Sequence, residues 1–394
     1  MVRQIRCVMM RGGTSKAVFL RESDLPADEA ERSRTILAIF GSPDRRQIDG
    51  LGGADPLTSK LAIIGPVRTD EPRAAGTHLT YTFGQVEIAH PEIDWLSLCG
   101  NISSAVGAFA IYEGYVKASE PVTQVRVFNT NLKRVLTIEV PVEEGRPLEQ
   151  GPYSVPGVPG TGAKILIDFS DTAGAATGAL LPTGRPVDRL SVPGVGEIDA
   201  SLVDIGNAHV FVRAGDLGLR GTEGAAQLDA DHELRARLER IRGVAAERMG
   251  MIKDAARSRE ESPATPILGI VSPPASYRDE NGGSVVNENE VDLVSRLMFM
   301  QQTHKTYAGT STVCTGVASR LTGTLVHEVT RMQMRGADTV RIGHPAGVIE
   351  TETQVEKSDS NAYIVRRATL GRTARRIMEG YVFIPDMSEL AVDH

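Results

Sequence analysis

Cysteine, tryptophan and long apolar runs are scarce in this sequence. Its 394 residues include three cysteines and one tryptophan, and aromatic residues make up only 5% of the chain. Cys7, Cys99 and Cys314 are odd in number and far apart, which argues against a disulfide framework and against a paired zinc site. No apolar run approaches the roughly 18 residues that a membrane span requires. We therefore expect a cytoplasmic protein with no metal ion and no membrane association.

Positive charge is also in deficit. The formal net charge is −7 and the basic residues are scattered, so nothing favours nucleic acid as a partner. The apolar stretch at residues 7–10 is shorter than the core of a secretory signal peptide. The P-loop, the Gly-x-Gly-x-x-Gly fingerprint, Gly-x-Ser-x-Gly and His-Glu-x-x-His are all missing. These absences remove the sequence argument for a nucleotide cofactor, and we expect no cofactor at all.

Glycine and proline, at 40 and 21 residues, are abundant instead and punctuate many short predicted strands. Two predicted helices consist of small residues, one from about Asn101 to Glu113 and one around Cys314 that ends near Gly323. Each follows several strands, so the chain is interpreted as one architecture used twice, a strand-rich layer around an apolar helix. The expected strands are 5–10, 17–20, 61–64, 78–88, 122–128, 134–140, 164–169, 198–205, 209–212, 267–271, 339–342, 348–355, 360–369 and 374–384, and two further helices are expected at 29–40 and 229–249.

The length of the chain favours two domains of similar size. Residues 174–186 are rich in glycine, alanine and proline, which is typical of a boundary. We therefore expect domains at 1–182 and 183–394, and the sequence leaves open whether the last strand returns to the first domain.

The segment from Leu98 to Phe109 carries the strongest chemical signal. It places Cys99, Gly100 and Asn101 directly before a predicted buried helix. A helix N-terminus has unpaired N–H groups and partial positive charge, so it favours anions, and thiols in such positions ionise more readily than free thiols. The same residues could hold a substrate carboxylate and exchange a proton beside it. The alternative is a small cysteine that merely packs.

Two glycine pairs share this affinity for anions. Gly12-Gly13 is followed at once by Thr14-Ser15, and Gly52-Gly53 stands shortly before Thr58-Ser59. Glycine permits backbone conformations in which successive N–H groups form an anion-binding nest, although each pair could equally form only a tight turn. Together with the helix start at Cys99, the two pairs suggest a substrate with two or three carboxylates.

Lysine and histidine residues complete the candidate chemistry. Lys60 directly precedes an apolar strand, and a desolvated amine can act as a general base next to an activated carbon. Lys60 could instead lie at the surface or pair with a charge of the substrate. Lys16 stands in a similar Thr-Ser-Lys triplet and is a rival, although loop structure or carboxylate pairing is the favoured role for it. His304 and His344 lie in polar or glycine-containing segments and could line a cleft or serve structure alone.

Five motifs in combination connect this sequence to a known family. With Met10–Lys16, Asp49–Lys60, Cys99–Asn101, His304–Tyr307 and His344–Gly347, the chain resembles the PrpF family over essentially its full length. The resemblance implies an α+β, diaminopimelate-epimerase-like fold. Such a fold has two pseudo-symmetric domains, each a β-barrel-like sheet around a central helix, with the site between them.

Within that family, residues 47–55 look closest to the 4-oxalomesaconate tautomerase branch. The resemblance therefore implies a cofactor-independent 1,3-allylic isomerase or tautomerase of an unsaturated tricarboxylic acid, first of all 4-oxalomesaconate in aromatic-acid catabolism. Methylitaconate and aconitate are the alternative substrates. Lys60 is expected to abstract a proton and Cys99 to deliver one. The expected substrate-binding residues are Arg11, Gly12, Gly13, Thr14, Ser15, Gly53, Ser59, Gly100, Asn101, Ser103, His304, Cys314 and His344.

Two further functions stay open at this stage. Epimerases of the same superfamily use two facing cysteines, so Cys99 and Cys314 could form a racemase pair, although the Cys314-Thr315-Gly316 context departs from the epimerase pattern. The chain could also be a non-catalytic carboxylate-binding accessory protein. In each case the expected partner is a small polycarboxylate, and the oligomeric state, a homodimer included, is left open.

Overall fold

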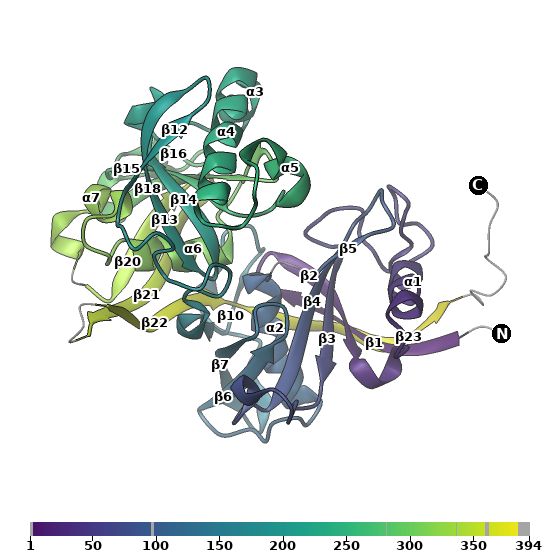
Figure 1. Cartoon of the computed structure of the whole chain (residues 1–394). Coiled ribbons are helices and arrows are strands. Elements are labelled where there is room, and N and C mark those ends of the chain that lie inside the picture. The colour runs from purple at the N-terminus through teal and green to yellow at the C-terminus, as the bar shows by residue number, and fades with distance from the viewer. Residues whose placement is uncertain (1–2, 96–97, 281, 336, 359–361, 385–394) are drawn as a thin grey trace, which may run out of the picture. The chain divides into compact units, whose positions relative to one another are not determined.

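Two compact units make up the chain in the computed structural model, which describes residues 3–95, 98–280, 282–335, 337–358 and 362–384. Unit 1 comprises Met1–Ile167 and Arg372–His394, and unit 2 comprises Asp168–Gly371. Figure 1 labels the main elements of each unit. The last strand, β23 (Ala374–Ile384), belongs to unit 1 because it pairs in antiparallel fashion with β1 (Arg3–Gly12).

The boundary between the units lies earlier in the chain than the expected position after residue 182. Asp204 explains why the segment before residue 182 belongs to unit 2. Its buried carboxylate accepts hydrogen bonds from the backbone of Ala176 and from the backbone and hydroxyl of Thr177. Its own backbone pairs with Gly174 and Leu180. The glycine-rich composition therefore reflects a tight loop around Asp204 rather than a linker.

Unit 1 is built on a ladder of alternating antiparallel and parallel strand pairs. From β1 the ladder runs antiparallel to β2, parallel to β3, antiparallel to β4, parallel to β6 and antiparallel to β7. The elements are β2 (Ser15–Arg21), α1 (Glu29–Phe40), β3 (Lys60–Gly65), β4 (Leu79–Val86), β5 (Ile93–Asp94), α2 (Gly100–Tyr112), β6 (Val122–Asn129), β7 (Arg134–Glu143), β8 (Arg146–Pro147), β9 (Tyr153–Ser154), β10 (Thr161–Gly162) and β11 (Ile165–Asp168).

Unit 2 repeats this ladder with other strands. From β13 the order is antiparallel to β14, parallel to β15, antiparallel to β18, parallel to β20 and antiparallel to β21. The elements are β12 (Asp188–Val192), β13 (Gly196–Ile205), β14 (Asn207–Arg213), α3 (Ala225–Ala230), α4 (His232–Arg248), α5 (Ser258–Glu261), β15 (Ile267–Ser272), β16 (Tyr277–Arg278), β17 (Val285–Val286), β18 (Leu293–Phe299), β19 (Gln302–Thr303), α6 (Gly309–Ala318), α7 (Leu325–Val329), β20 (Thr339–His344), β21 (Gly347–Lys357) and β22 (Tyr363–Arg372).

Each unit encloses one helix of small, apolar residues. In α2 every residue from Gly100 to Ile111 except Asn101 is buried, and all ten residues of α6 are buried. A helix that is apolar on all sides needs neighbours on all sides, and the curved ladder of each unit supplies them. The expected α+β fold, a sheet around a central helix used twice, is confirmed.

In unit 1 the two faces of the sheet contact different helices. α2 lies on one face, where Phe109 of the helix meets Phe19 of β2 with ring centroids 5.1 Å apart. α1 covers the opposite face and forms a hydrophobic cluster with alternate residues of β2 and β3. The cluster includes Val18, Leu20, Ile36, Ile39, Phe40, Leu61 and Ile63.

Some expected elements differ from the observed ones. The single helix expected at 229–249 is two helices, because Asp231 caps the start of α4 by accepting from the Leu234 N–H. The helix around Cys314 begins at Gly309 and ends at Ala318 rather than near Gly323. At this end the carbonyl of Ala318 accepts a hydrogen bond from the Thr324 hydroxyl. The start of the strand expected at 360–369 falls on residues 359–361, outside the described residues. Strands β12 and β18 and helix α7 were not expected from any pattern in the sequence.

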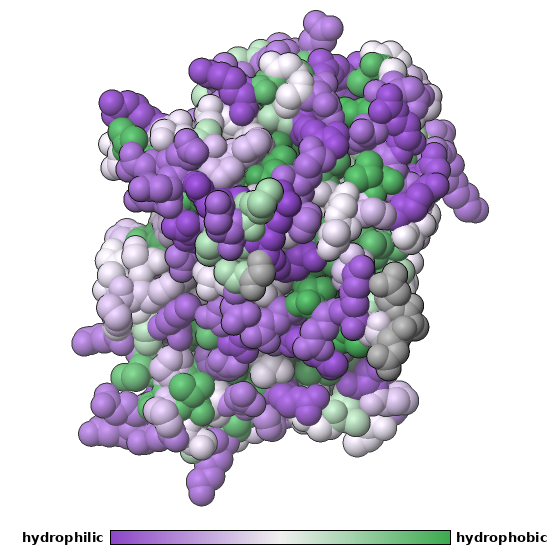
Figure 2. Space-filling view, turned by 90° about the vertical axis from the view of Figure 1, so that its left-hand side faces the viewer, coloured by the Kyte–Doolittle hydropathy of each residue, from purple (hydrophilic) through white to green (hydrophobic). Residues whose placement is uncertain are grey.

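In the described part of the chain, no helix combines the length and the apolar character needed to cross a bilayer. The face shown in Figure 2 is hydrophilic over most of its area, with hydrophobic residues in small separate groups. This distribution is ordinary for the surface of a globular protein.

Glu113, which follows α2, binds three arginines of unit 1. Its carboxylate lies 2.7 Å from Arg6, 2.6 Å from Arg21 and 2.7 Å from Arg376, and its side chain is only 4% exposed. Burial raises the pKa of this carboxyl group, but the hydrogen bonds from the three arginines outweigh burial and lower the pKa to about 2. The cluster ties the end of the central helix to β1, β2 and β23.

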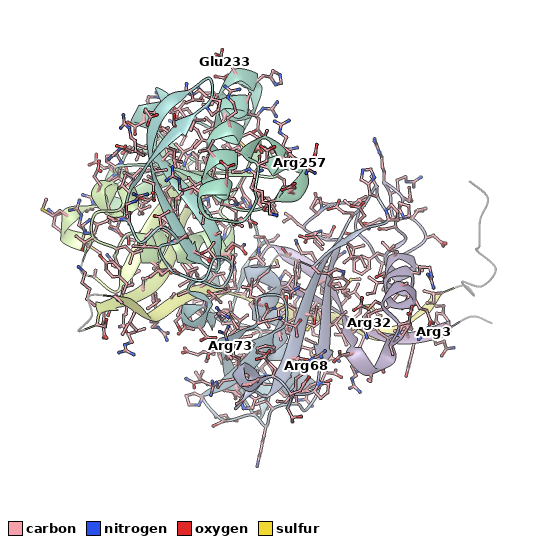
Figure 3. All side chains as sticks on the ribbon, in the orientation of Figure 1. Arg3, Arg32, Arg68, Arg73, Glu233 and Arg257 are labelled. Atoms are coloured by element: carbon pink, nitrogen blue, oxygen red, sulfur yellow. The ribbon has the colours of Figure 1, made fainter. Side chains whose placement is uncertain are left out.

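We expect the Glu113→Gln variant to lose about 3 kcal/mol of unfolding free energy at neutral pH, from the linkage between a depressed pKa and stability. The ordinary pKa is 4.5 and the folded pKa is about 2, so this stability is complete above pH 4.5 and is lost as the pH falls from 4.5 to 2. Urea unfolding at pH 7 and pH 3 measures the effect, and the variant should show the smaller difference between the two. Glu31→Gln is the control, because Glu31 forms an exposed ion pair with Arg3. Arg3 is labelled in Figure 3. Equal pH dependence in the wild type and Glu113→Gln would contradict the prediction.

Candidate active site

One face of β4 carries Tyr81, Phe83 and Gln85, because side chains alternate along a strand. The register of β3 and β4 sets Lys60 opposite Gln85. The Nζ atom of Lys60 donates to Oε1 of Gln85 and lies 5.4 Å from the centroid of the Phe83 ring. Lys60 is 8% exposed, and it forms no ion pair with any described residue. The amine is thus buried among neutral neighbours.

Cys99 caps the N-terminus of α2 and is half-buried. Its side chain makes no capping hydrogen bond, whereas its carbonyl accepts from the backbone N–H and the hydroxyl of Ser103, each at 3.0 Å. The first turn of the helix, which begins at Gly100, therefore presents N–H groups that no described side chain caps. A carboxylate is the natural acceptor for such a group of donors.

Lys60 and Cys99 lie on the same face of the unit 1 sheet. Tyr81 shares that face with Phe83, and its hydroxyl lies next to Ser103 and close enough to Cys99 to interact electrostatically. Burial raises the pKa of Tyr81 well above its ordinary value, and the electrostatic interaction with Cys99 acts in the same direction. One strand face thus borders the lysine at one end and the cysteine at the other.

Asn101 connects the start of α2 to the turn between β1 and β2. Its Nδ2 donates to Thr14 Oγ1 at 3.0 Å and lies 3.5 Å from Ser15 Oγ. A Cβ atom on Gly12 would lie 2.3 Å from the Asn101 carbonyl oxygen, and one on Gly13 would lie 2.2 Å from Asn101 Oδ1. Gly13 also has a φ of +49°, which favours glycine. Both glycines are needed because the helix start approaches this turn so closely.

Arg372 is a site residue that the sequence argument missed. Its Nε donates to Asn101 Oδ1 at 2.7 Å, and its guanidinium group interacts electrostatically with Tyr153 and Cys99. Burial lowers the pKa of Arg372 to about 10, so it still carries a positive charge at neutral pH. This charge reinforces the preference of the helix start for an anion. Arg372 follows Cys99 by 273 positions along the chain, so no local motif connects the two residues.

The turn at Gly13 is braced by the protein itself. The Gly13 N–H donates to the Thr373 carbonyl at 2.8 Å, and Arg11 Nη1 donates to the carbonyls of Gly13 and Thr373 and to the Thr373 hydroxyl, each at 3.0 Å. The expected anion nest is therefore not open at Gly13, whose amide already has a protein acceptor. In this geometry Arg11 supports the turn, and Thr14 and Ser15 present hydroxyl groups beside Asn101.

The second glycine loop is likewise held by protein groups. The Gly52 N–H donates to the Phe40 carbonyl, and the Ala54 N–H donates to Gln47 Oε1, so the amides on either side of Gly53 are engaged. Gln47 Nε2 donates to the hydroxyl of Ser59, which donates to the Val86 carbonyl. Ser59 is fully buried. These contacts make Ser59 a support for the adjacent Lys60 rather than a residue exposed to substrate.

The remaining expected site residues lie in unit 2. The Nδ1 atoms of His304 and His344 accept from the backbone N–H groups of Thr306 at 3.1 Å and Ala346 at 3.2 Å. Their roles toward a substrate stay predictions. Cys314 lies within α6 with 0% exposure, and burial raises its pKa well above the ordinary value. That position leaves its thiol no surface for contact with a substrate.

The repeated topology shows which unit 2 residues occupy the places of Lys60 and Cys99. Lys60 pairs with the third residue of β2, and Ile267 pairs with the third residue of β14. The N-terminal cap of α6 is Ala308, where α2 has Cys99. At these two equivalent positions unit 2 therefore has neither an amine nor a thiol. The geometry does not favour a racemase that uses Cys314 as its second base.

Comparison with solved structures agrees with this fold. The chain matches a hydroxyproline epimerase from Agrobacterium vitis with a TM-score of 0.52 and 10% identity, over 98% of this chain and 94% of that one. At this identity the likeness shows the fold alone, that of the diaminopimelate-epimerase-like class. The chain belongs to the PrpF family, because the family model described as PrpF protein matches residues 1–385.

Relatives within the family are more similar. A 3-methylitaconate isomerase of Eubacterium barkeri is 51% identical over 381 residues, covering 97% of each chain. A 2-methyl-aconitate isomerase of Shewanella oneidensis is 37% identical, also over 97% of each chain. A (4E)-oxalomesaconate Delta-isomerase of Novosphingobium is 36% identical, over 96% of this chain and 97% of that protein. The crystal structure of a methylitaconate-delta-isomerase matches with a TM-score of 0.87 and 50% identity, over 100% of this chain and 99% of that one.

These names confirm the expectation that the chain is an isomerase. They support the choice of substrate less well, because the oxalomesaconate isomerase is less similar to this chain than the methylitaconate isomerase. Residues 47–55, which suggested the oxalomesaconate branch, form the loop held by Gln47. A motif with such a structural role is a poor guide to the substrate.

Proposed function

We propose that the protein is an allylic isomerase of small unsaturated polycarboxylates, and that 3-methylitaconate is its preferred substrate. The observation that carries the proposal is the shared sheet face on which Lys60 and Cys99 lie, beside an uncapped helix N-terminus and Arg372. The similarity to the 3-methylitaconate isomerase of Eubacterium barkeri supports the choice of substrate. It replaces the 4-oxalomesaconate expected from the sequence.

The chemistry requires one proton to leave and another to arrive two bonds away. In 3-methylitaconate the C3 hydrogen is acidic because C3 adjoins both a carboxylate and the carbon–carbon double bond. Lys60 Nζ, as a neutral amine, takes this proton, and the electron pair spreads over the allyl system and the carboxylate as a dienolate. Cys99 Sγ–H then protonates the methylene carbon, which gives dimethylmaleate. The resulting ammonium and thiolate regain their starting states by proton exchange with water.

The N-terminus of α2 and Arg372 stabilise the negative charge that develops on the carboxylate. The N–H groups that begin at Gly100 follow Cys99 directly, and the guanidinium of Arg372 donates to Asn101 and interacts electrostatically with Cys99. Such donors are in place before the reaction, so they need no reorganisation when the charge appears. The hydroxyls of Thr14 and Ser15 add donors held by Asn101.

Proton NMR in deuterated buffer tests the substrate and the reaction together. The protein is offered 3-methylitaconate, aconitate and 4-oxalomesaconate separately, and the first should show deuterium uptake with migration of the double bond at the highest rate. Faster turnover of 4-oxalomesaconate would overturn the substrate assignment. Tight binding of all three acids with no deuterium uptake would overturn the enzymatic proposal and favour an accessory carboxylate-binding protein.

A further inference from the structure

The side-chain amide of Gln85 is oriented by three hydrogen bonds. Its Nε2 donates to the carbonyl of Ser59 at 2.9 Å and to that of Pro56 at 3.2 Å, and its Oε1 accepts from Lys60 Nζ. Backbone carbonyls only accept hydrogen bonds, so rotating the amide by 180° would set its oxygen against the carbonyl oxygens of Ser59 and Pro56, acceptor against acceptor. The amide oxygen is therefore fixed toward Lys60.

We propose that Gln85 is the positioning residue that holds the amine of Lys60 for proton transfer while leaving it free to lose its own proton. The inference rests on the proposed role of Lys60 as the base. Cross-strand pairing puts Gln85 directly opposite Lys60 on the same face, so the contact is built into the register of β3 and β4.

The choice of a neutral acceptor matters because Lys60 must alternate between amine and ammonium. An amide oxygen accepts an N–H hydrogen from either form, so it keeps Nζ in one place throughout the cycle. A carboxylate at the same place would also hold Nζ, but its negative charge would stabilise the ammonium and oppose its deprotonation. Lys60 forms no ion pair with a described residue, so glutamine at position 85 sets a neutral acceptor, and no negative charge, against the amine.

The supports of Gln85 are themselves rigid. The Ser59 carbonyl belongs to the residue whose hydroxyl is buried between Gln47 and Val86. The backbone N–H of Val86 also donates to the Ser59 carbonyl at 3.1 Å. The loop before β3 is thereby held against β4 by the residue that directly precedes Lys60. The side-chain amide of Gln85 connects the Ser59 carbonyl to the Nζ atom of Lys60.

The test compares Gln85→Glu and Gln85→Met by measuring kcat/KM from pH 6 to pH 10 with 3-methylitaconate. Gln85→Glu keeps an acceptor and adds a charge, so the acidic limb of the profile should move up by about 1 pH unit or more, with activity recovering at high pH. Gln85→Met removes the acceptor without adding charge, so kcat should fall across the range with the limb unmoved. Gln124→Glu is the matched control, because Gln124 is exposed on β6, and its profile should equal the wild type.

Each outcome decides the inference. A wild-type profile for Gln85→Glu, or a uniform loss equal to that of Gln85→Met, would overturn it, since a merely structural role would not move the limb. Circular dichroism of both variants establishes that they fold. If Lys60→Met keeps its activity, the proposed function fails at its base. If Lys60→Met is inactive but Gln85→Glu shows no shifted limb, only the role of Gln85 fails.

Discussion

The Lys60→Met variant is expected to lose about 10²- to 10⁴-fold in kcat, the usual contribution of a general base. Methionine is unbranched and apolar, so it can occupy the space over the Phe83 ring, but it offers no lone pair basic enough to take a proton from carbon. The loss should appear in kcat rather than in KM, because the proposed carboxylate site is at the start of α2 and Arg372 instead. Initial rates over a range of substrate concentrations separate kcat from KM, and circular dichroism establishes that the variant folds.

Lys16→Met is the matched control for this substitution. Ala17 pairs with Lys60 in the β2–β3 ladder, so the neighbouring Lys16 points to the opposite face of the sheet. The two lysines stand in similar Thr-Ser-Lys contexts, and only the register distinguishes them. Lys16→Met should therefore keep near-wild-type turnover. Loss of activity in Lys16→Met together with retention in Lys60→Met would transfer the role of base to the rival lysine.

Local signals in the sequence were enough to locate most of the elements. Helix α1 begins and ends as expected because Asp28 caps its first turn and Gly41 adopts a left-handed conformation after its last residue. Helix α2 could be located because its small, apolar residues follow a strand-rich segment without interruption. In both cases the determining contacts lie within a few residues along the chain, where a pattern can reveal them.

Contacts between distant segments could not be predicted in the same way. Arg372 reaches Asn101 only because the chain returns to unit 1 after all of unit 2, and no spacing encodes that return. The strand pattern does indicate that Gln85 shares a face with Tyr81 and Phe83, since the three residues alternate along a predicted strand. Its importance, however, depends on the register with Lys60, which the strand pattern alone does not fix.

The glycine pairs show a related limit. Composition indicates that backbone N–H groups could converge on an anion, but it does not show whether protein acceptors already occupy them. At Gly13 and Gly52 they do, through Thr373 and Phe40, whereas the first turn of α2 has no side-chain cap among the described residues. The proposed anion site therefore has fewer donors than the sequence suggested, and these donors are the N–H groups at the start of α2 and Arg372.

The Cys99→Ala variant is expected to lose isomerisation by about 10²- to 10⁴-fold, because no acid remains to protonate the methylene carbon. If Lys60 and Cys99 each carry out one of the two proton transfers, this variant should still exchange the C3 hydrogen of 3-methylitaconate for deuterium, since Lys60 is intact. Lys60→Met should show the opposite pattern, with exchange at C3 lost. Deuterium NMR at each carbon distinguishes the two patterns even where the double bond no longer migrates.

Cys314→Ala is the control for the loss of a thiol. Cys314 is fully buried in α6, with its sulfur 3.8 Å from the Val203 carbonyl, so the substitution should lower stability slightly and leave turnover intact. A racemase with two cysteines would instead lose activity in both cysteine variants. If Cys99→Ala and Lys60→Met each abolish exchange at every carbon, the amine and the thiol act as one relay, and the assignment of one proton to each residue is wrong. If Cys99→Ala still moves the double bond at the wild-type rate, Lys60 carries the proton across the allyl system alone.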